Sequence, residues 1–145
     1  MRMAFFVDGE PIVLRIHRER EIDLNAMMHP TFGLPLADHS YEVARRLILN
    51  AYRWSDTSYE SADIIDLAFM ISRWGPVPDS VWHWLDQVGG SQILAAYAYA
   101  IDLLRTPGRL ETCMERLKID PGLAPDILAA LSSGASQHIL RERFP

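Results

Sequence analysis

The chain of 145 residues contains a single cysteine, Cys113, and hardly any lysine. One cysteine excludes an internal disulfide and a zinc site built from cysteine thiolates. No apolar run approaches the roughly 20 residues of a membrane span, and the apolar start Ala4–Val7 is too short for the core of a secretory signal. We therefore expect a cytoplasmic protein with no membrane partner.

The scarcity of lysine leaves arginine as the main basic side chain of this protein. Fourteen residues are basic, and Lys118 is the only lysine among them. Any anion that the protein contacts is therefore expected to meet guanidinium groups. With a formal net charge of −5 and a pI near 5.4, the composition disfavours broad, salt-driven binding to nucleic acid.

Several catalytic motifs are absent as well. The chain has no Gly-rich phosphate loop ending in Lys, no nucleophile elbow and no Cys/His couple, which excludes P-loop, hydrolase and thiol chemistry. No two histidines stand one helical turn apart, so the sequence predicts no metal site. The histidines are His17, His29, His39, His83 and His138.

The sequence begins with two apolar runs, Ala4–Val7 and Ile12–Ile16, on either side of Asp8-Gly9. An Asp-Gly pair between apolar runs is a strong signal for a β-hairpin turn. Asp8 and Glu10 have the outline of a metal-binding pair, but their place at a turn favours solvated loop residues over metal ligands.

After Asp38 the apolar residues recur at helical spacing through most of the remaining chain. Capping residues and Gly or Pro breaks divide this region into about five or six helices. The predicted organisation is a hairpin segment and connector over residues 1–38, a helical bundle over 39–133 and a tail over 134–145. The predicted fold class is α+β, with short N-terminal antiparallel strands followed by a C-terminal helical bundle.

Trp82 and Trp84 are a candidate platform for stacking nucleic-acid bases. Residues two apart on a helix do not share a face, however. The sequence therefore favours one indole in the core and the other at partial exposure.

A helix starting near Glu60 or Ser61 carries Asp63 and Asp66 beside its apolar stripe. Because they stand three positions apart, both carboxylates can address a single partner. One interpretation is a ligand site. The other is a structural pairing with the preceding helix, on which Arg45, Arg46 and Arg53 lie, and under this interpretation Asp66 is expected to matter more for folding than for binding.

Four segments resemble one enzyme family. They are Phe6–Ile12, Arg18–Leu24, Ser61–Met70 and Arg73–Pro78. They are similar to segments of the bacterial AbiEii/AbiGii-like nucleotidyltransferases, the toxin halves of some toxin/antitoxin and phage-abortive systems, and the similarity runs from Phe5 to about Pro125. The resemblance implies a nucleotidyltransferase-like core over residues 1–38 and identifies the chain with the distal part of such an enzyme.

The resemblance also implies a chemistry for which this chain lacks the main groups. A nucleotidyltransferase holds divalent ions and a nucleoside triphosphate with clustered carboxylates. The family supplies a Gly-Ser turn and an Asp-x-Asp strand, yet Gly90-Ser91 is the only Gly-Ser here and opens an apolar helical run. The chain as given is thus expected to hold no cofactor, and Mg²⁺ with a nucleoside triphosphate is implied only if a missing N-terminal half is present.

Five positions correspond to the family's site. Arg46 stands where the family has a lysine, and Asp63 and Asp66 match the family pattern, so these three are the candidate site residues. Arg15 stands at a position where the family commonly has an acid, and Ala62 stands where it usually has an arginine. A cation at Arg15 would repel metal ions.

These features leave different functions open. The first is a truncated or degenerate nucleotidyltransferase-like protein without transfer activity as given, which would be a metal-dependent enzyme only with upstream residues. The alternative is a non-catalytic protein-binding module on the same scaffold, such as an antitoxin-like partner or an inhibitor of a defence system. We expect a protein partner or a homo-oligomer. In the family, further strands of the N-terminal half would lie beside residues 4–16, and without them the hairpin has an open edge. A tRNA partner has no support from the charge.

Overall fold

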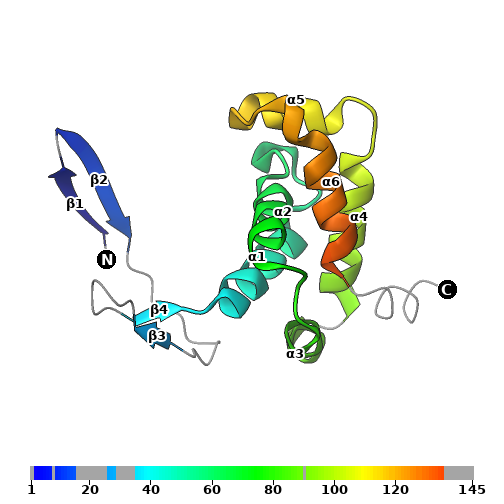
Figure 1. Cartoon of the computed structure of the whole chain (residues 1–145), viewed down its shortest axis with the longest axis horizontal. Coiled ribbons are helices and arrows are strands. Elements are labelled where there is room, and N and C mark those ends of the chain that lie inside the picture. Colours follow the sequence, from blue (N-terminus) through cyan, green and yellow to red (C-terminus); the bar gives the residue numbers. More distant parts are fainter. Residues whose placement is uncertain (1, 8, 16–25, 29–34, 90, 136–145) are drawn as a thin grey trace.

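The computed structural model describes residues 2–7, 9–15, 26–28, 35–89 and 91–135, and it is mostly helical (Figure 1). Its elements, in chain order, are β1 (Arg2–Val7), β2 (Glu10–Arg15), β3 (Ala26–Met28), β4 (Pro35–Ala37), α1 (His39–Arg53), the 3₁₀ turn η1 (Thr57–Tyr59), α2 (Ala62–Trp74), α3 (Asp79–Gly89), α4 (Ser91–Leu104), α5 (Arg109–Leu117), the 3₁₀ turn η2 (Pro121–Leu123) and α6 (Ala124–Gly134).

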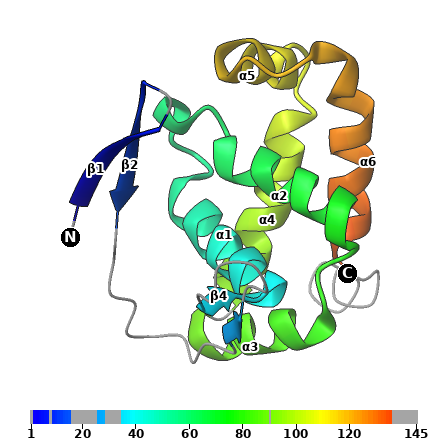
Figure 2. The same ribbon diagram turned by 60° about the vertical axis from the view of Figure 1, so that its left-hand side comes forward.

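Helix α2 forms the centre of the helical bundle. It packs against α1 and α6 and also contacts α4, and both views show it between these helices (Figures 1 and 2). Ile65, Leu67 and Ala68 are completely buried. Each fully buried Leu or Ile contributes roughly 1.5–3 kcal/mol to stability, so the apolar stripe of α2 holds the bundle together.

The two ends of the bundle are covered by shorter helices. In both views α5 lies across one end and α3 lies near the other (Figures 1 and 2). Tyr97 of α4 ties the bundle to α6, because its buried hydroxyl donates a hydrogen bond of 2.6 Å to the carbonyl of Leu131. Its ring also meets Trp82 of α3 edge to face, with ring centroids 5.4 Å apart.

Short polar side chains determine where helices begin. Asp38 accepts a 2.7 Å hydrogen bond from the backbone N–H of Tyr41 and so caps the start of α1. Asp120 accepts in the same way from Gly122 at η2. Helix α2 ends at Gly75, whose φ of 92° favours a residue without a Cβ.

The predicted α+β fold class is wrong. Strands β1 and β2 pair only with each other, and so do β3 and β4, so that the strands described here form two separate antiparallel pairs and no sheet joins them. The principal contacts of the core join helices, and Figure 1 shows β1 and β2 apart from the bundle. The apolar surface is buried between helices, so the fold is a helical bundle with appended strand pairs.

Some predicted features lie outside the described residues. These are Asp8, the charged strand exit Arg18–Leu24, the histidines at 17, 29 and 138, and the tail beyond Ala135. Within the described residues, Trp82 is buried and Trp84 packs on the core at partial exposure, so the prediction for this pair is confirmed.

Candidate functional site

The fold brings the three candidate residues Arg46, Asp63 and Asp66 together. Arg46 lies on α1, and its Nη1 is 2.8 Å from Oδ1 of Asp63 and 3.1 Å from Oδ2 of Asp66 on α2. One guanidinium group therefore bridges both carboxylates, as their spacing on one helix allows. We call this group of residues, together with Arg53, the interhelix cluster.

Arg53 is the second cation of the interhelix cluster. It lies two helical turns after Arg46, and its Nη1 is 3.6 Å from Oδ2 of Asp63. Its guanidinium also lies over the ring of Tyr59, 4.6 Å from the ring centroid. The predicted pairing of the acids with the preceding helix is therefore confirmed for Arg46 and Arg53, whereas Arg45 is exposed.

The two acids differ in their surroundings. The side chain of Asp63 is only 7% exposed, whereas that of Asp66 is 50% exposed. Partial burial raises the pKa of Asp66 above its ordinary value of 3.8, Arg46 lowers it and the neighbouring Asp63 carboxylate raises it. Asp63 is thus the buried centre of the cluster, and Asp66 is its edge toward solvent.

A buried asparagine accompanies the cluster on α1. Asn50 is 1% exposed and lies between Arg46 and Arg53 in helical spacing, and its side-chain amide nitrogen has no acceptor in the described part of the protein. Sequence reasoning missed Asn50. The signal was available, because a polar residue in register with Val43 and Leu47 has to fall on the buried face of α1.

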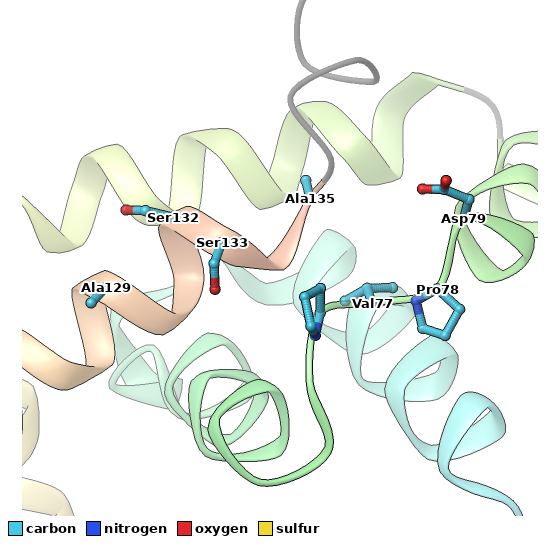
Figure 3. Close-up of a pocket in the computed structure, with 8 residues that line it drawn as sticks. Val77, Pro78, Asp79, Ala129, Ser132, Ser133 and Ala135 are labelled. Carbon is cyan, nitrogen blue, oxygen red and sulfur yellow. The ribbon is translucent and has the colours of Figure 1, made fainter.

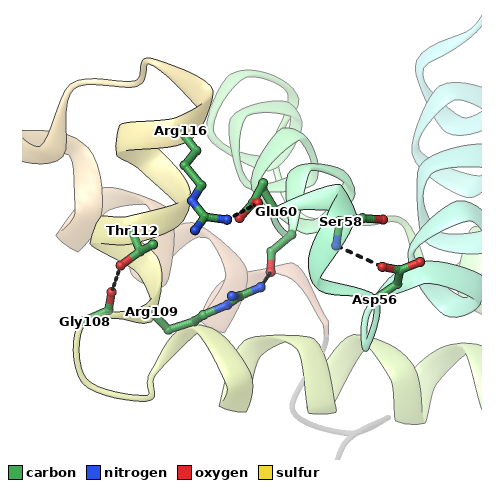
Figure 4. Close-up of polar contacts among 8 residues, drawn as sticks. Asp56, Ser58, Glu60, Gly108, Arg109, Thr112 and Arg116 are labelled. Atoms are coloured by element: carbon green, nitrogen blue, oxygen red, sulfur yellow. Dashed lines mark hydrogen bonds and ion pairs between the residues drawn. The ribbon is translucent and has the colours of Figure 1, made fainter.

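The backbone before α2 has an unusual conformation. Glu60 and Ser61 are consecutive non-glycine residues in the left-handed region, with φ of 49° and 55°. Such residues are uncommon and cost free energy. Arg116 of α5 pairs with Glu60, and Arg109 donates a long 3.5 Å hydrogen bond to the hydroxyl of Ser61 (Figure 4). The structure thus ties α5 to the start of α2, a link that no sequence pattern indicated.

The two substituted family positions do not join the interhelix cluster. Ala62 is the first residue of α2 and has no group that could bond to a ligand. Arg15 ends β2, which pairs it with Arg2 of β1, and this strand lies apart from α1 and α2 in Figure 1.

The histidines and the cysteine of the described residues contact other side chains or lie in the core. His39 stacks on Trp74 with ring centroids 4.1 Å apart, and His83 shares a 3.1 Å hydrogen bond with Gln87. Cys113 is buried. Over the described ranges, no group of three or more His, Cys, Asp or Glu residues is placed so that it could hold a metal ion.

A shallow groove of about 680 Å³ lies between the loop after α2 and the end of α6 (Figure 3). Pro76, Val77 and Pro78 form one wall. The hydroxyls of Ser132 and Ser133 on the other wall donate to backbone carbonyls of their own helix. The groove contains no residue of the interhelix cluster and no unengaged serine hydroxyl.

Comparison with known proteins gives no relative. No protein-family model, no curated protein and no solved structure matches this chain. Among the helices that the structure describes, none is long and apolar enough to cross a membrane.

Proposed function

We propose that this protein is a non-catalytic binding module for a protein partner. In this proposal the helical bundle is the scaffold, the β1–β2 hairpin is the binding element, and the transferase-like positions Arg46, Asp63 and Asp66 serve to hold α1 against α2.

The observation that carries the proposal is the isolation of the β1–β2 hairpin. Its strands pair only with each other among the strands described, and both views place it beside the bundle and not within it (Figures 1 and 2). Phe6, at its tip, is 74% exposed. Unpaired strand edges present backbone donors and acceptors, and adding a strand to such an edge is a common way to bind a protein.

The arrangement of the interhelix cluster supports a structural role for Asp63. Its Oδ1 lies against Arg46 and its Oδ2 faces Arg53, so both carboxylate oxygens are directed at guanidinium groups. A divalent ion bound to Asp63 would lie close to two positive charges, which opposes the clustering of metal ions and carboxylates that nucleotidyl transfer requires.

A degenerate transferase remains the second candidate, favoured by one observation. Asp66 is half exposed, and Arg46 beside it is partly exposed, so this corner of the cluster is open to a ligand in solution.

The test for transferase activity is incubation with labelled nucleoside triphosphates, magnesium or manganese, and either bulk tRNA or protein. We expect no label incorporation. Metal-dependent incorporation that is lost in an Asp63→Ala, Asp66→Ala variant would support the transferase instead.

Site-specific photo-crosslinking tests the binding proposal. A photoreactive phenylalanine analogue replaces Phe6, and in a control it replaces Tyr52, an 83% exposed aromatic residue of α1. In cells of the source organism, we expect the Phe6 probe to give a discrete protein adduct and the Tyr52 probe to give none. No adduct at Phe6, or the same adducts from both probes, would refute the proposal.

A further inference from the structure

The hairpin's register determines which backbone groups face outward. Val7 pairs with Glu10 across a two-residue turn in which Gly9 has a φ of 85°. The residues that flank a two-residue turn bond to each other, and hydrogen-bonded pairs then alternate with non-bonded pairs along the ladder. Phe6 and Pro11 are therefore a non-bonded pair, and their backbone N and C=O point away from the partner strand.

The same alternation makes the two edges of the hairpin unequal. On β1 the outward positions are Arg2, Ala4 and Phe6, and each offers both an N–H and a C=O. On β2 the outward positions are Pro11, Val13 and Arg15. Because proline has no N–H, the edge of β2 lacks a donor at its first position, and prolines at an edge discourage further pairing. Only the edge of β1 is complete.

We infer that the edge of β1 binds β1 of a second copy of this chain, antiparallel and about a two-fold axis at Ala4. This inference rests on the proposed function and names its partner. It joins two hairpins into one four-stranded sheet, with the strand order β2, β1, β1 of the partner and β2 of the partner.

The residues of β1 favour pairing with themselves. With Ala4 opposite Ala4 of the second copy, Arg2 lies opposite Phe6 in both halves of the sheet, and no two like charges meet. All the outward groups of β1 then find partners. Pairing β2 with itself in the same manner would place Arg15 opposite Pro11 and leave a carbonyl without a donor at each end.

The number of facing residue pairs also selects the register. Slipping the two β1 strands by two residues would bring Arg2 opposite Ala4 and remove one of the three facing pairs.

A six-residue edge buries little surface compared with stable dimers. We therefore expect an association that depends on concentration in the micromolar range, on the order of 1–100 µM.

A pair of cysteine variants of the full chain tests the inference. Ala4 and Val13 are paired in the register of the hairpin, so Ala4→Cys and Val13→Cys place a thiol at equivalent positions on the two opposite edges. In the inferred sheet, the Cα atoms of the two copies of residue 4 lie about 5.5 Å apart, within the range that a disulfide spans. The native Cys113 is buried and does not compete.

Under mild oxidation, we expect Ala4→Cys to form a disulfide-linked dimer and Val13→Cys to stay monomeric. Light scattering of the unmodified chain should show dimers as concentration rises, and Ala4→Pro should abolish them while Val13→Pro retains them. Equal crosslinking of both cysteine variants, or no crosslinking by Ala4→Cys, would overturn the inference.

The photo-crosslinking experiment at Phe6 separates this failure from that of the proposed function. An adduct with the mass of two copies supports self-pairing. An adduct with a different protein refutes self-pairing and leaves the protein-binding proposal intact. The absence of any adduct refutes both.

Discussion

At the scale of single residues, the structure gives Asp63 and Asp66 different surroundings. The resemblance and the helical spacing pointed to Asp63 and Asp66 alike, and Asp66 was expected to matter for folding. Asp63 is the buried acid, contacted by two arginines, and Asp66 is half exposed. The two acids differ in burial because Asp63 falls near the apolar stripe of α2. The sequence alone does not show which side of α2 is covered by α1.

Replacing Asp63 with Asn should therefore destabilise the fold more than replacing Asp66 with Asn. Removing a buried, paired carboxylate leaves Arg46 and Arg53 with a weaker partner, and we expect a loss of roughly 1–3 kcal/mol. Asp66→Asn should change the free energy of unfolding by about 0–1 kcal/mol, since half-exposed ion pairs are weak. Urea unfolding of both variants measures this, and an equal or larger loss for Asp66→Asn would contradict it.

Because the pKa of Asp66 is raised in the folded state, the stability of the protein should depend on pH. The folded state holds this proton more tightly than the unfolded state does, so the contribution of Asp66 favours folding at pH below 3.8 and is lost as pH rises through the raised pKa. Going from pH 3.5 to pH 7, the stability of the Asp66→Asn variant relative to the unmodified protein should increase, as urea unfolding at both values would show. A relative decrease would mean that attraction to Arg46 outweighs burial.

At the scale of elements, helical periodicity was sufficient to place the helices but not their fine contacts. Runs such as Ile64 to Ile71 predict a buried face directly. The contacts that α5 makes with Glu60 and Ser61 join residues far apart in the chain, so local patterns do not reveal them.

The close approach of three helices depends on Gly134. A Cβ at this position would overlap the Tyr97 hydroxyl of α4 and Cδ1 of Ile71 on α2. Gly134→Ala should therefore destabilise the bundle by roughly 1–3 kcal/mol, as measured by thermal unfolding. Gly122→Ala is the matched control, because its Cβ would come no closer than 3.3 Å to Asp120. A smaller loss in Gly134→Ala than in the control would show that α6 shifts freely.

At the scale of the whole molecule, composition and periodicity predicted the helical bundle, but the fold class was wrong. The hairpin signal around Asp8-Gly9 was interpreted as short antiparallel strands of an α+β fold. In the structure the described strands stay in separate pairs, because two strands alone do not build a layer that the bundle could bury. The family resemblance stays a prediction, and the contacts of its candidate residues favour a structural use.

Backbone amide exchange in β1 tests most directly the central claim that the edge of β1 pairs with β1 of a second copy. In the unmodified chain, the outward amides of Ala4 and Phe6 should exchange rapidly at low concentration and become protected as concentration rises. The amide of Val13, outward on β2, should exchange rapidly throughout. If Ala4 and Phe6 exchange as fast as Val13 at every concentration, β1 does not bind a second copy, and self-pairing at this edge is refuted.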